Sequence, residues 1–260
     1  MVIIVFHILL FLILTLLTQV GGLALILGLL ISNQFEFRFR KPLFVLFMYL
    51  FFTYLAVPFI APFFGREKLK NTEKIMPTSY MTILLNRNYV RPEMNELLQR
   101  VSDKLPTGMA LKYLDANFPF IDNFPLLPHL SHNDGRKIDL SFVYSDSTGK
   151  MTNLKPSRSG CGIFENPENV EFSQTEFCLA AGYWQYDYPK YLTLGEVNDG
   201  LTFSVNGTKE LMIAILSEYT VGKVFIEKHL RERMKLKDDR LKFQGCQAVR
   251  HDDHIHIQLK

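Results

Sequence analysis

The chain is 260 residues long and nearly neutral, with 29 basic against 26 acidic side chains. This balance argues against nucleic acid as a partner, because proteins that bind nucleic acid usually carry a basic excess or stripe. The length is sufficient for a membrane segment followed by one well-buried domain.

Two stretches near the beginning of the chain, residues 1–32 and 42–64, contain no Asp, Glu, Lys or Arg. A helix of about 20 apolar residues crosses a bilayer. The sequence therefore predicts a membrane hairpin over 1–64, with helices at about 3–32 and 42–64. The alternative is a cleaved signal peptide with one anchor, but the first run lacks a charged start and is too long. Basic residues are nearly balanced on the two sides of the second helix, so charge alone does not fix the orientation.

The rest of the chain is divided into a connector over residues 65–85 and one domain over 86–260. The pattern of this domain predicts an α+β fold, with a small antiparallel sheet and flanking helices. Helices are expected at 92–105, 208–219 and 228–237, and strands at 109–114, 138–144, 224–226 and 254–259.

The three cysteines form no C-x-x-C pair, which argues against a thiolate zinc knuckle. Cys161 and Cys178 flank a loop-like stretch, and a disulfide between them is one expectation; three buried thiols, with Cys246, is the other. The aromatic stretch at 183–188 is expected either to line a substrate cleft or to belong to the core.

The histidines are distributed unevenly, and histidine is the commonest protein ligand for a transition metal. Five of the seven form two clusters, His129 and His132 in the first and His251, His254 and His256 in the second. The other two, His7 and His229, are expected in the first apolar segment and on a solvated helix surface. If the two clusters meet in space, they form a metal site.

Strand alternation supports such a meeting. Successive side chains of a strand point to opposite faces. Asp139 therefore lies opposite the apolar residues of its strand, and His254 and His256 share the polar face of the last strand. His132, in the turn before Asp139, is expected to reach the same surface. Two imidazoles and one carboxylate, with a fourth position for water, are typical of a catalytic zinc site, whereas structural zinc usually has four protein ligands.

The spacing of these residues resembles that of a known group of enzymes. The stretch from His132 to Asp139 matches the H-x-x-G-x-x-x-D pattern of the zinc peptidases that include lysostaphin-type enzymes, D-Ala-D-Ala metallopeptidases and the Hedgehog signalling domain. His254 and His256 match their H-x-H. The additional histidines, His129 and His251, are similar to those of the penicillin-insensitive murein endopeptidases.

The resemblance implies roles for individual residues. His132, Asp139 and His256 would bind zinc, and His254 and His251 would lie beside the metal-bound water, one of them as general base; which one stays open. His129 would lie in a second shell or contact substrate. Asp252 and Asp253 are expected either to orient an imidazole or to form a solvated turn.

The resemblance also implies an activity. The chain is expected to be a membrane-anchored zinc metallopeptidase, a murein endopeptidase that cleaves peptide bonds or cross-links of peptidoglycan. Its domain would face the periplasm or exterior from the inner membrane. The alternatives are a D-Ala-D-Ala carboxypeptidase and a non-catalytic, Hedgehog-like zinc-binding interaction module.

Overall fold

The computed structural model describes residues 2–260, which divide into two compact units. The first contains the residues up to Leu69 together with Met81–Pro92 and Ala116–Arg136. The second contains Lys70–Tyr80, Glu93–Asp115 and Lys137–Lys260.

The first apolar stretch is not one helix, so the prediction of a helix over 3–32 is wrong. It forms α1 (Val2–Thr18) and α2 (Gly21–Ser32), of 17 and 12 residues. The break lies at Gln19, whose φ of +63° is left-handed. The Thr18 hydroxyl accepts a hydrogen bond from the Gly21 amide at 2.8 Å, and the Gln19 side chain accepts one from the Phe120 amide at 3.1 Å. Each piece is shorter than the roughly 20 residues that cross a bilayer.

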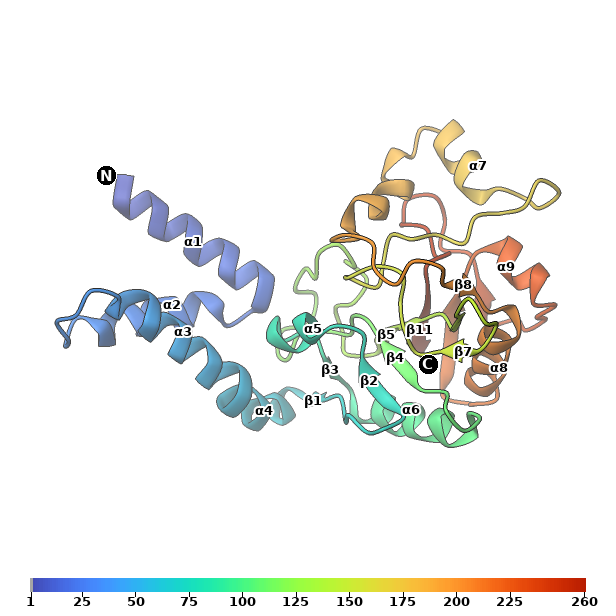
Figure 1. Cartoon of the computed structure of the whole chain (residues 1–260). Helices are drawn as coiled ribbons and strands as arrows, with labels where there is room; N and C mark the ends of the chain where they lie inside the picture. The colour runs from blue at the N-terminus through green and yellow to red at the C-terminus, as the bar shows by residue number, and fades with distance from the viewer. Residues whose placement is uncertain (1) are drawn as a thin grey trace. The chain divides into compact units, whose positions relative to one another are not determined.

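The second apolar stretch forms a continuous helical run from Arg40 to Phe64 (Figure 1). Its segments are α3 (Arg40–Phe51), the π-helix η1 (Phe52–Ala56), α4 (Val57–Ile60) and the 3-10 helix η2 (Ala61–Phe64). Within residues 2–260 this is the one helix that is long and apolar enough to cross a membrane. The π-helix precedes Pro58, which lacks the amide proton that a regular helix would use.

The remainder of the first unit is held by a small apolar cluster of Val20, Val57, Ala61 and Tyr89. Its short elements are β1 (Glu67–Lys68), α5 (Tyr80–Leu84) and β3 (Tyr89–Val90), with β1 and β3 antiparallel. The last part, residues 116–136, has no helix or strand of its own.

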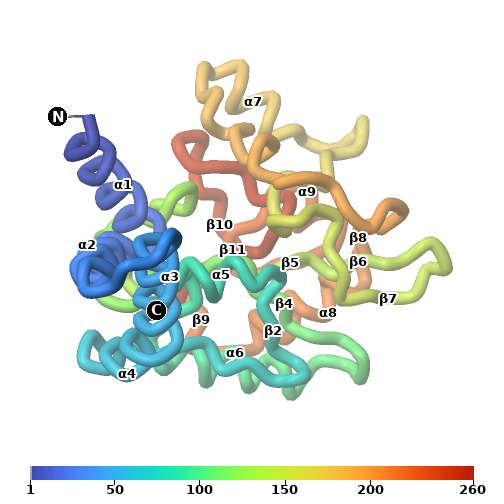
Figure 2. Tube along the Cα trace, turned by 60° about the vertical axis from the view of Figure 1, so that its left-hand side comes forward, coloured from blue at the N-terminus to red at the C-terminus, as the bar shows by residue number. Residues whose placement is uncertain are grey.

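The second unit contains a six-stranded sheet in the order β10-β9-β11-β5-β4-β2 (Figure 2). The strands are β2 (Ile75–Pro77), β4 (Leu111–Tyr113), β5 (Lys137–Ser141), β9 (Val221–Phe225), β10 (Leu241–Lys242) and β11 (His254–Leu259). The α+β class is confirmed. The sheet is antiparallel only in its centre, because β10 runs parallel to β9 and β2 parallel to β4.

The two central strands follow the predicted alternation. Ile138 and Leu140 of β5 and Ile255 and Ile257 of β11 are all 0 % exposed. Because neighbouring side chains point to opposite faces, burying these four fixes which residues occupy the other face. Burial of the apolar residues therefore sets the register in which the two strands that carry Asp139 and His256 pair.

Helices α6 (Pro92–Lys104) and α8 (Val205–Leu216) lie next to one another in both views (Figures 1 and 2). Arg100 of α6 binds Glu218, just after α8, at 2.7 Å. The remaining elements are α7 (Gln174–Ala180), the 3-10 helix η3 (Trp184–Leu192), α9 (Lys228–Arg233) and a second sheet in the order β7-β6-β8. Its strands are β6 (Tyr144–Ser145), β7 (Met151–Thr152) and β8 (Thr202–Phe203).

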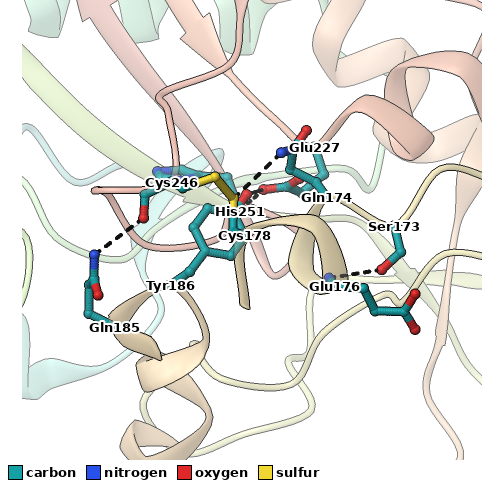
Figure 3. Close-up of a disulfide and its surroundings, with 9 residues drawn as sticks. All are labelled: Ser173, Gln174, Glu176, Cys178, Gln185, Tyr186, Glu227, Cys246 and His251. Atoms are coloured by element: carbon teal, nitrogen blue, oxygen red, sulfur yellow. Dashed lines mark hydrogen bonds between the residues drawn. A yellow bond between two sulfur atoms is a disulfide. The ribbon is translucent and has the colours of Figure 1, made fainter. Parts of the chain in front are cut away.

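The disulfide joins Cys178 of α7 to Cys246, 68 residues later in the sequence (Figure 3). Both alternatives expected from the sequence are therefore wrong, and Cys161 keeps its thiol. The bond connects the segment that contains α7 and η3 to the loop that leads into β11.

An ion pair between α9 and a distant loop makes stability sensitive to acid. Arg233 donates to Glu171 at 3.0 Å and holds the pKa of this carboxyl at about 2, below its usual 4.5. Because the pKa of Glu171 is lower in the folded protein, the ion pair contributes its full stability above pH 4.5, and this contribution is lost as the pH falls toward 2. We therefore expect Glu171→Gln to lower the melting temperature at pH 6 and to have no effect below pH 2.

Thermal unfolding followed by circular dichroism across this pH range measures the difference. Glu232→Gln on the exposed side of α9 is the control and should match the unmodified protein at every pH. A deficit for Glu171→Gln that stays constant down to the lowest pH would contradict the assignment.

Candidate metal centre

The centre of the site is a pair of side chains that face one another across β5 and β11. In the antiparallel register, His256 lies opposite Asp139. The Nδ1 of His256 is 2.8 Å from an Oδ of Asp139. Asp139 is 0 % and His256 2 % exposed. A carboxylate so deeply buried needs a cation or hydrogen-bond donors around it.

His254 lies next to this pair, on the same face of β11 and opposite Ser141. Its Nε2 is 3.7 Å from the same Asp139 oxygen. On the other side of the ring, its Nδ1 is hydrogen-bonded to Asp253. The second oxygen of Asp253 accepts a hydrogen bond from the Gly162 amide at 2.6 Å. Asp253 is thus fixed by the backbone and orients the His254 ring.

His251 completes a group of three imidazoles in the second unit. Its ring centre is 4.7 Å from that of His254 and 5.7 Å from that of His256. The position of this residue is set by Glu227, which accepts a hydrogen bond from the His251 amide at 3.1 Å and another from the Tyr186 hydroxyl (Figure 3). Burial raises the pKa of Glu227, and the nearby charge of Asp252 adds to this effect.

Asp252 has a different role from Asp253. It is fully buried and pairs with Arg250, whose Nε donates to it at 2.7 Å. Burial raises the pKa of the Asp252 carboxyl even though Arg250 acts in the opposite direction. The same guanidinium binds Asp187 of η3 at 2.7 Å and lies over the ring of Phe164. Asp252 therefore holds the loop before β11, and the solvated turn expected as an alternative is wrong for both aspartates.

The first histidine cluster lies in the first unit, within the segment 116–136. The rings of His129 and His132 are 5.4 Å apart, and His132 is 1 % exposed. The Nδ1 of His132 is 2.6 Å from the carbonyl oxygen of Ala116. A carbonyl only accepts, so a hydrogen bond here has Nδ1 as its donor, the arrangement found where a histidine binds a metal through Nε2.

The turn after His132 is held by its glycine. Gly135 has a φ of +80°, a conformation that L side chains rarely adopt. Its amide donates to the Asn117 side chain at 3.1 Å, and its carbonyl accepts from the Arg91 amide at 2.7 Å. The glycine at this position of the sequence pattern is therefore required by the backbone.

Several residues around the site were not found from the sequence. Gly162, Glu227 and Tyr186 fix the histidine loop from segments far away in the chain, and no local pattern identifies them. His229, expected on a solvated surface, is 1 % exposed, and its Nε2 is 2.7 Å from the Glu165 carbonyl oxygen. Trp184 is 71 % exposed and Tyr186 1 %, so the aromatic stretch is partly surface and partly core.

The second unit brings together Asp139, His251, His254 and His256. Asp253 contacts His254 in this group, and Asp252 is paired with Arg250. His129 and His132 lie together in the first unit. Neither a known protein family nor a curated protein matches the sequence of this chain.

Proposed function

We propose that the chain is a membrane-anchored zinc metallopeptidase that hydrolyses peptide bonds or cross-links of peptidoglycan. The observation that carries this proposal is the buried pairing of Asp139 with His256, with His254 beside it and oriented by Asp253. The residue types and their spacing resemble those of the murein endopeptidases.

The donor set fits zinc. Carboxylate and imidazole bind this ion at about 2.0–2.2 Å, so two ligands in a tetrahedral site lie roughly 3.4 Å apart. The Asp139 and His256 atoms are 2.8 Å apart and need to separate only slightly to hold an ion. We propose His132 as the third ligand, through its Nε2, because the Ala116 carbonyl already occupies its Nδ1. Bound zinc supplies an activated water and polarises a carbonyl group.

His254 is the residue best suited to move the proton. Its Nδ1 is held by Asp253, and its Nε2 lies on the side of the proposed metal site, 3.7 Å from an Asp139 oxygen, where it would accept a proton from water and deliver it to the leaving amine. The contact with Asp253 also stabilises the imidazolium that forms between these two steps. His251 packs against His254, and its backbone is fixed by Glu227, so we assign it to orienting the substrate or His254.

We propose that the chain is anchored in the inner membrane and that its second unit faces the periplasm or exterior. The helix from Arg40 to Phe64 would serve as the anchor. The Cys178–Cys246 disulfide supports an oxidising compartment. Peptidoglycan lies in the same compartment.

The full chain, purified in detergent and loaded with zinc, should cleave cross-linked muropeptides, and a chelator should abolish this cleavage until zinc is restored. Separation of the products by chromatography and mass spectrometry identifies the bond. Release of terminal D-Ala alone would make the enzyme a carboxypeptidase, and zinc binding without any turnover would favour the interaction module. Either result would overturn the endopeptidase proposal.

A further inference from the structure

A second group of metal-binding side chains lies directly beside His254. Cys161, Asp253 and His254 each offer a donor atom, and these atoms all lie within 4.8 Å of one another. Cys161 is far from the other two in the sequence. Asp253 and His254 are buried, and Cys161 is partly exposed, which gives an ion access from solvent.

The loop that carries Cys161 is built to hold it in this place. The Ser157 hydroxyl donates to the Cys161 carbonyl at 2.8 Å, and the Cys161 amide donates to the Ser159 hydroxyl at 3.1 Å. The next residue, Gly162, has a φ of +82° and binds Asp253 through its amide. The loop and the histidine segment are therefore joined at the residue that follows the thiol.

The chemistry of the three donors selects the metal. A thiolate, an imidazole and a carboxylate together suit zinc and cobalt, whereas calcium and magnesium prefer oxygen ligands alone.

We propose that Cys161, Asp253 and His254 form a second, exchangeable zinc site, separate from the site of His132, Asp139 and His256. Three protein ligands leave a position for water, which favours exchange over a closed structural site. His254 lies between the two sites: it is a ligand of the second site, and its Nε2 is 3.7 Å from Asp139 of the first.

Occupation of the second site has a direct chemical effect. An ion bound between His254, Asp253 and Cys161 replaces the proton on the imidazole and takes the carboxylate that orients it. His254 then no longer accepts or delivers a proton. This consequence, which rests on the proposed function, makes excess zinc an inhibitor; the metal site itself does not depend on that function.

Cobalt tests the site without any activity measurement. The full chain in detergent is titrated with Co²⁺ while the near-ultraviolet sulfur-to-cobalt charge-transfer absorption is recorded. Because Cys178 and Cys246 form the disulfide, Cys161 is the only thiol, and the absorption has one possible source. We expect it in the unmodified protein and in His256→Ala, and we expect Cys161→Ser to lack it and to bind one zinc ion fewer.

Absence of the sulfur-to-cobalt absorption in the unmodified protein, with its thiol shown to be reduced, would overturn the site. Equal zinc stoichiometry in Cys161→Ser would also overturn it. In the activity arm, excess zinc should slow muropeptide cleavage at least fivefold in the unmodified protein and not in Cys161→Ser. Equal inhibition of both would overturn the inhibitory role. If no preparation cleaves muropeptides, the proposed function fails while the cobalt result still decides the site.

Discussion

On the proposed function, replacing His256 with Ala is expected to abolish both peptide hydrolysis and zinc binding at the main site, that of His132, Asp139 and His256. The substitution removes the imidazole that faces Asp139 across the two central strands. An activated water and a polarised carbonyl each depend on the metal and together are worth several kcal/mol. The rate of cleavage of cross-linked muropeptides should therefore fall by at least about a thousandfold, since each 1.36 kcal/mol added to the activation free energy lowers the rate about tenfold. Zinc content by mass spectrometry and product formation by chromatography measure the two effects.

Gln258→Ala is the matched control for this substitution. Gln258 lies two residues further along β11, on the same face as His256 and opposite Lys137. It should keep zinc and activity, which separates loss of a ligand from damage to the strand. Full activity in His256→Ala would eliminate the proposed ligand set, provided that its circular dichroism spectrum equals that of the control.

Replacing His254 with Ala should have the second largest effect, and a different one. We expect kcat to fall by about 10²–10⁴, the usual range for loss of a general acid-base group, while the zinc at the main site stays bound. Asp253→Asn should lower kcat less, by about 10–100-fold, because the amide keeps an oxygen that can accept from the His254 ring and removes only the negative charge beside it. Steady-state kinetics and zinc content are measured on the same preparations.

His251→Ala provides the comparison that separates the two histidines. If His254 carries the proton, His251→Ala should change KM more than kcat, because the His251 ring packs against His254, its amide is held by Glu227, and its assigned role is to orient the substrate. A loss of main-site zinc in His254→Ala would make His254 a ligand, and a larger fall of kcat in His251→Ala would transfer the acid-base role to that residue.

The strands that carry the site were predictable because their signal is local. Isoleucine and leucine alternate with Asp139 in one segment and with His254 and His256 in the other, and burial of the apolar residues then fixes the polar face. Their shared polarity was compatible with a place in one sheet, and the structure shows that they pair directly. The sequence contained no signal for the parallel edge strands β2 and β10, which are two or three residues long.

The errors come from contacts between distant segments. Apolar composition predicted one helix through Gln19, but the side chain of that residue binds the Phe120 amide and the helix breaks there. Cys178 pairs with Cys246 because the fold brings α7 to the loop before β11, which spacing does not reveal. His229 is on a charged helix and was expected in solvent; the Glu165 carbonyl satisfies one of its nitrogens in the interior.

The register of β11 against β5 links the site to the folding of the sheet. A slip by one residue would bring the histidines to the face of Ile138 and move the isoleucines to the face of Asp139. A metal ion held by Asp139 and His256 would bind only the native pairing, so its free energy of binding would be added to the stability of that pairing over every shifted one. On the proposed function, zinc therefore also selects the native strand register, because a chain that folds in a shifted register has no site that binds the ion.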